Sequence, residues 1–216
     1  MEKEYNSTNI EFERDKIDEA RSNRFKISAG LRMVSAGIQA WGGITSNLSP
    51  LVIEGVEEIN DGLFFAASSI EAGSKNKKYT QRARKYAKVF AGTAAVFSTI
   101  DTSLDIYNDH GTLFESMKGI NLYSHQYEAA IGALAINSVV YFVNRKGRKS
   151  SNASDKFAWR DSIKDSVIPA AVMVLGATKA PHLAEYGFEF FGVGYGWYNV
   201  KKLFSSWKPK AKSAKV

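Results

Sequence analysis

The sequence of 216 residues contains no cysteine, only three histidines and no glycine-rich phosphate loop of the GxxxxGK[ST] type. The absence of cysteine excludes disulfide bonds and thiolate metal sites. His110, His125 and His182 fall in or beside predicted external connections, and no Ser/His/Asp arrangement can be assembled around them. We therefore predict that the chain is not an enzyme and holds no tightly bound cofactor. The first 25 residues are charged and lack an apolar core, so no signal peptide is predicted.

The 29 lysines and arginines fall in blocks that separate six segments rich in apolar and small residues. Dense blocks precede the first segment, separate the second from the third and the fourth from the fifth, and follow the sixth. Because cytoplasmic connections of membrane proteins carry an excess of Lys and Arg, this alternation predicts an all-α bundle of six transmembrane helices with both termini cytoplasmic. The predicted spans are 26–44, 51–72, 87–107, 125–144, 157–178 and 183–204.

This topology divides the chain into three predicted parts. Residues 1–25 form a cytoplasmic amphipathic segment, residues 26–204 form the six-span domain, and residues 205–216 form a basic cytoplasmic tail that rests on anionic headgroups. The predicted location is the plasma membrane, with the chain as an integral protein and the lipid bilayer as a partner.

Two other classes compete with a membrane protein. The mean hydropathy is only −0.25, and Arg32, Asp101 and Glu189 interrupt the apolar segments, which leaves a soluble amphipathic helical bundle open. The net charge of +7 would also suit a nucleic-acid binder. Such proteins gather basic residues on one patch with interleaved aromatics, whereas here the basic residues lie at segment ends. No nucleic-acid partner is predicted.

Acidic residues recur at helical spacing in two of the segments. Glu54, Glu57 and Asp61 lie at i, i+3 and i+7 on one face of the second segment, and Asp161 and Asp165 lie at i and i+4 in the fifth. Two helices that each present carboxylates can share one cation, and oxygen-only ligands suit Mn²⁺, Mg²⁺ or Fe²⁺ better than Zn²⁺. The other interpretation is that these acids simply form ion pairs with basic residues: Arg32 would neutralise Glu54 or Glu57, and Arg160 and Lys164 would pair with acidic residues near them.

Residues 41–65, WGGITSNLSPLVIEGVEEINDGLFF, resemble the end of the first span and the second span of cation diffusion facilitators. In that family a Gly-Gly pair, a short Ser/Asn-Leu turn and an Asp precede an HxxxD or DxxxD metal motif. Glu54 stands at the position of that first Asp, and Glu57 and Asp61 match the motif as ExxxD. The stretch from Asp161 to Asp165 is similar to the family's second motif, and Pro181 lies where the family has a short turn before its sixth span.

The resemblance implies an exporter of divalent cations, proton-coupled and homodimeric. Its transport ligands would be Glu57, Asp61, Asp161 and Asp165, with Glu54 beside them. Members with acid-only motifs are typically linked to manganese, so the implied cargo is Mn²⁺ or Fe²⁺ rather than Zn²⁺.

Three departures keep other functions open. Histidine is absent from both motifs, Lys164 places a positive charge inside the second motif, and the tail is too short for the family's C-terminal domain. A non-transporting membrane scaffold or partner subunit with the same fold is the main alternative. A soluble or membrane-inserting helical protein, such as a pore former, is the third hypothesis.

Overall fold

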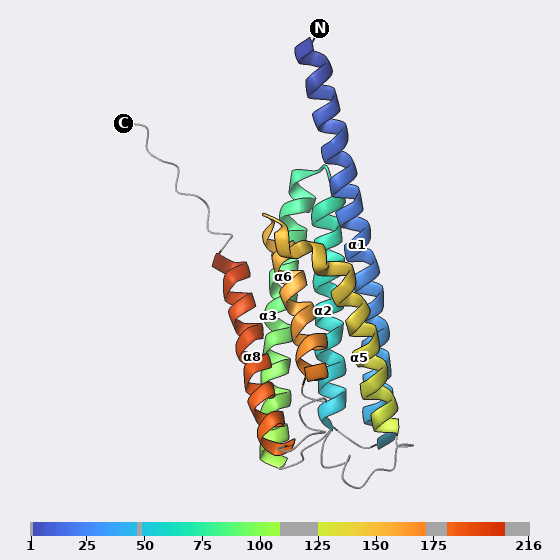
Figure 1. Ribbon diagram of the computed structural model, residues 1–216, viewed down its shortest axis with the longest axis vertical. Coiled ribbons are helices and arrows are strands. Elements are labelled where there is room, and N and C mark those ends of the chain that lie inside the picture. The colour runs from blue at the N-terminus through green and yellow to red at the C-terminus, as the bar shows by residue number, and fades with distance from the viewer. Residues whose placement is uncertain (1, 47–48, 109–124, 172–180, 206–216) are drawn as a thin grey trace, which may run out of the picture.

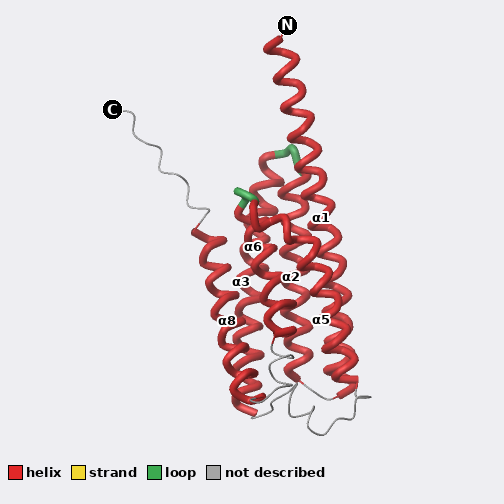
Figure 2. The backbone as a smooth tube through the Cα atoms, in the orientation of Figure 1, coloured by secondary structure: helices red, strands yellow, loops and turns green. Residues whose placement is uncertain are grey.

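The computed structural model describes residues 2–46, 49–108, 125–171 and 181–205 (Figure 1). Every regular element in these ranges is helical (Figure 2). The elements are α1 (Glu2–Ser46), α2 (Ser49–Gly73), α3 (Lys77–Asn108), α5 (His125–Asn144), the 3₁₀ turn η1 (Arg145–Lys149), α6 (Ala153–Ser162), the π-helical turn η2 (Ile163–Val167) and α8 (Pro181–Ser205). The helical backbone continues from η2 through residue 171.

Local sequence signals account for several helix ends. Proline lies in the first turn of α2 at Pro50, where its missing N–H costs no hydrogen bond. Before α3, the side chain of Asn76 accepts a hydrogen bond from the Lys78 N–H at 2.9 Å, and Asn152 caps α6 through the Ser154 N–H at 3.3 Å. The α2 helix ends at Gly73, a residue type that favours helix termination.

The helices pack in a closed order around a common interior. Helix α1 contacts α2 and α5, α2 contacts α3, α3 contacts α8, and α6 contacts both α8 and α5. The N-terminal part of α1 extends beyond the bundle, at the end where α3 and α6 begin (Figure 1). The segment predicted over residues 1–25 thus continues directly into the helix predicted over 26–44.

Small residues set the close approach of α1 and α2. A Cβ atom on Gly55 would lie 3.1 Å from the Ala36 carbonyl oxygen, and one on Gly62 would lie 2.8 Å from the Met33 side chain. These two glycines lie two turns apart on the α2 face toward α1, so the helix register depends on them.

An aromatic cluster fills the half of the interior nearer the α6 N-terminus. Phe25, Phe64, Phe65 and Phe157 are buried, and their ring centroids lie 4.5 to 6.1 Å apart in tilted or edge-on geometry. Val140 and Leu203 extend the same cluster. This apolar layer joins α1, α2, α5, α6 and α8.

Within the described residues, no helix carries an apolar stretch long enough to cross a bilayer. The predicted six-span membrane bundle and the predicted integral membrane location are therefore wrong. The physical reason lies in two of the basic blocks, which belong to helices, although the block Arg145–Lys149 does form the turn between α5 and α6. Residues 14–26 belong to the body of α1, and residues 77–88 form the first three turns of α3. Lys and Arg are good helix formers, so these blocks extend the helices instead of ending them.

Most predicted segment positions nevertheless match helices. The segments 51–72, 125–144 and 183–204 agree with α2, α5 and α8 to within two residues at each end. The predicted connection 108–124, the tail 205–216 and the end of the fifth segment fall mostly outside the described residues.

Candidate cation site

The central part of the bundle interior contains a cluster of ionisable side chains, here called the interior network. Its members come from α1, α2 and the junction of α6 with η2. These three elements converge on the side of the aromatic layer that is farther from the α6 N-terminus. They are Arg32, Glu57, Glu58, Asp61, Asp161, Lys164 and Asp165. All are buried except Asp165, which is half-buried.

Arg32 lies at the centre of one side of the network and is fully inaccessible to solvent, with 0% exposure. Its Nη1 donates to Glu58 Oε2 at 2.8 Å, and its Nη2 donates to Asp161 Oδ2 at 3.0 Å and also to Asp165 Oδ2. The other Glu58 oxygen accepts a hydrogen bond from the Asn137 amide on α5. One guanidinium thus joins α1 to α2 and to the α6–η2 segment.

Lys164 occupies the other side of the network. Its Nζ donates to Glu57 Oε1, lies 3.2 Å from Asp165 Oδ1 and 4.0 Å from Asp61 Oδ2. The same three carboxylates each place an oxygen within 4.8 Å of the others. The lysine ammonium therefore sits beside the one group of described residues whose geometry could hold a metal ion.

Asp61 is the exception within this network. The residue has 0% exposure, yet neither carboxylate oxygen has a hydrogen-bond partner. Burying a carboxylate without hydrogen bonds is costly, because the lost hydration is not replaced. In total five carboxylates face two permanent cations, so three negative charges are not balanced when all five acids are ionised.

The π-helical turn determines how the α6–η2 side chains are presented. Its signature is the hydrogen bond from the Ile168 N–H to the Ile163 carbonyl, five residues back. Within this wider turn, Lys164 and Ser166 are buried and Asp165 is half-buried. Single π-helical turns inside α-helices occur frequently at functional sites.

Burial shifts the protonation equilibria of the network. Desolvation raises the pKa of Glu57 to about 7, even though Lys164 opposes that shift. Desolvation also raises the pKa of Glu58, and it raises the pKa of Asp61 and of Asp161 well above the ordinary value for aspartate. Near neutral pH the network therefore holds protons, which reduces the surplus negative charge.

The pKa values of the two cations are raised as well, but for a different reason. Burial lowers the pKa of Arg32 and of Lys164, but the surrounding carboxylates, Asp165 foremost, more than offset it and leave each pKa well above its ordinary value. Both side chains stay charged across the physiological range, so only the acids exchange protons there.

Only some of the predicted ligands lie together in the structure. It brings Glu57, Asp61 and Asp165 together, while Asp161 accepts a hydrogen bond from Arg32 and is not in that group. Glu54 is half-buried and also lies outside the group. His110, and the side chains of His125 and His182, lie outside the described residues.

Sequence reasoning missed part of the network. The predicted partner of Arg32 was Glu54 or Glu57, but on α2 Arg32 forms its ion pair with Glu58. Asn137 was not anticipated, because a single asparagine in an apolar segment gives no spacing signal. Lys164 was expected either to pair with neighbouring acids or to disturb the second motif, and it lies beside all three clustered carboxylates.

A second charged cluster, the end network, lies where α6 begins. Its members are Arg21, Arg24, Glu71, Arg84 and Asp155. Asp155 accepts hydrogen bonds from Arg21 at 3.2 Å, from Arg24 and from the Ser150 hydroxyl.

The other carboxylate of the end network is satisfied in the same way. Glu71 accepts hydrogen bonds from Arg84 and from the Ser154 hydroxyl, both at 2.8 Å. All four carboxylate oxygens of the end network thus have partners.

No protein-family model, curated protein or solved structure matches this chain. The resemblance to cation diffusion facilitators stays a prediction from the motifs in residues 41–65 and 161–165.

Proposed function

We propose that the interior network is a reversible binding site for one divalent cation, with Glu57, Asp61 and Asp165 as protein ligands. The observation that carries this proposal is Asp61, which is fully buried with two unpartnered oxygens inside a cluster of surplus negative charge. A bound divalent cation would supply the missing partner for both oxygens and would offset two of the three surplus negative charges.

The ligand chemistry favours a hard cation. Oxygens up to 4.8 Å apart can share one ion, because metal–oxygen bonds of about 2.0–2.6 Å allow that separation. The network contains carboxylates and no nitrogen or sulfur ligand, a set that suits Mn²⁺ or Mg²⁺ better than Zn²⁺. Mn²⁺ is the first ion to test, in agreement with the acid-only motifs.

The ammonium group of Lys164 competes with a metal ion for the same carboxylates. Its ammonium neutralises part of the acidic charge when no metal is bound, so a metal ion must displace it from Glu57 and Asp165. A Cβ atom on Gly196 of α8 would lie 3.4 Å from Lys164 Cδ, and glycine at this position leaves space beside the lysine stem. Protons leave as the metal enters, since the ligands must be deprotonated to coordinate it.

Equilibrium dialysis against Mn²⁺ at pH 7.5 tests the proposal. We expect one Mn²⁺ per wild-type chain, and Asp61→Asn should weaken binding by more than about 100-fold, above the usual effect of losing an outer-sphere contact. Asp155→Asn in the end network is the matched control, because it removes an equivalent charge without touching the interior. The proposal is wrong if wild type binds no Mn²⁺, or if both variants bind as wild type does.

Lys164→Gln provides a second arm with the opposite sign. Removing the competing ammonium while keeping a polar side chain should strengthen Mn²⁺ binding by about tenfold, the equivalent of one lost charge-assisted hydrogen bond. Weaker binding in this variant would contradict a competitive role for the lysine. The predicted export of the ion in exchange for protons, and the predicted homodimer, stay predictions.

A further inference from the structure

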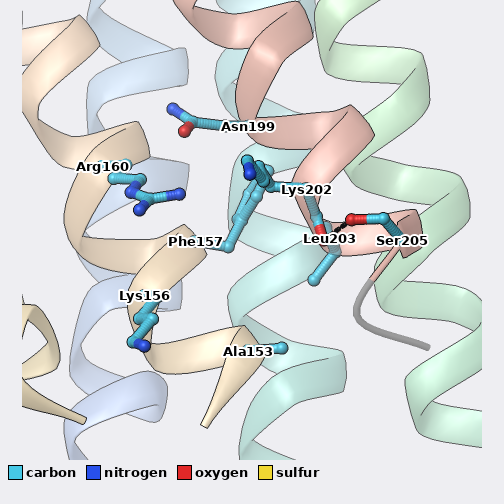
Figure 3. A pocket seen from close by; sticks show the side chains of 8 residues that line it. All are labelled: Ala153, Lys156, Phe157, Arg160, Asn199, Lys202, Leu203 and Ser205. Atoms are coloured by element: carbon cyan, nitrogen blue, oxygen red, sulfur yellow. Dashed lines mark hydrogen bonds between the residues drawn. The ribbon is translucent and has the colours of Figure 1, made fainter. Parts of the chain in front are cut away.

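A cavity of about 250 Å³ lies between α6 and α8, on the outer side of the aromatic layer (Figure 3). Its lining residues come from residues 153–160 of α6 and from the last turns of α8. They are Ala153, Lys156, Phe157, Arg160, Asn199, Lys202, Leu203 and Ser205. Three of these eight side chains are cationic and none is acidic.

The cations of this cavity have no acidic partner among the described residues. Lys156, Arg160 and Lys202 form no ion pair there, although the end network lies only one turn away along α6. Arg160 and Lys202 instead both lie over the ring of Tyr198, at 5.7 and 5.4 Å from its centroid. Both cations thus contact the same ring by cation–π attraction, which does not neutralise them and leaves their charge available to an anion.

Asn199 is a second, independent observation that points to a ligand in this cavity. Its side chain is 1% exposed, and neither its amide nitrogen nor its amide oxygen has a hydrogen-bond partner. Figure 3 shows this amide on the side of α8 that faces α6, across from the Arg160 guanidinium. A buried, unsatisfied amide is costly to the fold, so a ligand that accepts from its N–H₂ group would account for the residue.

We propose that this cavity binds a phosphate monoester of a small organic group. Arg160 presents the planar fork that matches a phosphate in bidentate geometry, and Lys156 and Lys202 add point charges for a dianion. The apolar floor of Ala153, Phe157 and Leu203 suits a short carbon skeleton, and the volume limits the ligand to a small one. The phosphate belongs either to a free metabolite or to a lipid headgroup.

Two probes distinguish these sources. Glycerol 3-phosphate is titrated into the full chain and followed by calorimetry, and vesicles of phosphatidylcholine with or without phosphatidic acid are tested by flotation. EDTA is present throughout, so the interior network holds no metal. Binding of glycerol 3-phosphate identifies a free ester. Binding to phosphatidic acid vesicles alone identifies the headgroup. Each result supports the proposal only if the variants below reduce that binding.

The variants separate this cavity from general basic charge. Arg160→Gln combined with Lys202→Gln should weaken binding by about tenfold or more for each lost cation. Lys201→Gln, an exposed neighbour that does not line the cavity, should bind as wild type does. If the double variant and Lys201→Gln bind equally well, or if neither probe binds to wild type at millimolar concentration, the proposal is overturned.

Asn199→Leu distinguishes a ligand-binding amide from a structural one. The substitution removes the unsatisfied polar group at similar volume, so the melting temperature should stay the same or rise while binding weakens about tenfold. Unchanged binding in this variant, whatever its melting temperature, would remove Asn199 from the site and overturn the argument built on it. Asp61→Asn should leave phosphate binding unchanged, which keeps this outcome independent of the cation site.

Discussion

The interior network and the end network use the same residue types in opposite ways. In the end network two carboxylates face three arginines, and every carboxylate oxygen accepts a hydrogen bond. In the interior network five carboxylates face one arginine and one lysine, and Asp61 has no hydrogen-bond partner. The first arrangement balances its acids, and the second leaves an acidic surplus.

This difference separates a structural role from a binding role. A carboxylate that is paired and hydrogen-bonded in the native state stabilises the fold when it is ionised. Carboxylates that are buried in excess of their counter-ions destabilise the fold unless they take up protons or a cation. The end network therefore joins α6 to α1 and α2, whereas the interior network, under the proposed function, would be stabilised by binding a positive ion.

The largest expected effect comes from removing the central cation of each network. Arg32→Met should lower the free energy of unfolding by about 3–5 kcal/mol, because it leaves buried carboxylates without a partner. Arg24→Met should lower it by only about 1 kcal/mol, since Arg21 still pairs with Asp155. Urea unfolding at pH 7.5 measures both variants. Equal losses would show that the two networks do not differ as described.

The second effect is the pH dependence of stability. The folded-state pKa of Glu57 is raised from 4.5 to about 7, so the native state binds more protons than the unfolded state between these values. Stability should therefore fall as the pH rises through this window, by about 3 kcal/mol for this group alone. The raised pKa values of Glu58, Asp61 and Asp161 act in the same direction.

Urea unfolding at several pH values from 4.5 to 8 checks this expectation. Glu57→Gln should flatten the profile, because the amide does not titrate, and Mn²⁺ should restore stability at the alkaline end. A free energy of unfolding that rises with pH across this window would contradict the account of the interior network.

A smaller effect distinguishes the acids of the two networks at pH 8. Asp61→Asn removes a buried carboxyl group that has no hydrogen-bond partner and whose pKa is raised, and should raise the free energy of unfolding by about 1–2 kcal/mol. Asp155→Asn removes a carboxylate that accepts from two arginines and should lower it by about the same amount. Thermal unfolding of both variants beside wild type gives the two signs. A loss of stability in both would mean that Asp61 is a structural residue.

The smallest effect is expected at the exposed ion pair of Lys75 and Asp15, which lie 2.7 Å apart with side chains that are mostly exposed. Asp15→Asn should change the free energy of unfolding by less than about 0.5 kcal/mol, since water and salt screen the pair. Measured in the same urea series, this variant sets the baseline for both networks. A change above 1 kcal/mol would show that charge removal alone, without burial, explains the larger effects.

Much of the helix layout could be predicted, because apolar segments and helix-end residues such as Pro50 and Gly73 mark it in the sequence. Whether these helices span a membrane could not be predicted correctly from the sequence. Lysines and arginines within α1 and α3 give the same alternation with apolar segments as cytoplasmic connections do, so the charge pattern alone does not separate the two.

The acidic residues of the candidate site could be predicted from the sequence, but their ion-pair partners could not. Whether Arg32 meets Glu57 or Glu58 depends on the register of α1 against α2, which Gly55 and Gly62 set through close contacts that spacing does not reveal. The inward position of Lys164 accompanies a π-helical turn, and no residue pattern in that stretch predicts one.

The central claim is that surplus buried carboxylates take up a cation in exchange for protons. Calorimetric titration of the full chain with Mn²⁺ at pH 7, in two buffers with different ionisation enthalpies, counts the protons released per ion bound. We predict one Mn²⁺ per chain and the release of at least half a proton, since Glu57 with a pKa of about 7 is half protonated at pH 7, the pKa of Asp61 is also raised, and metal requires deprotonated ligands. Binding without proton release, or no binding at millimolar Mn²⁺, would contradict the account.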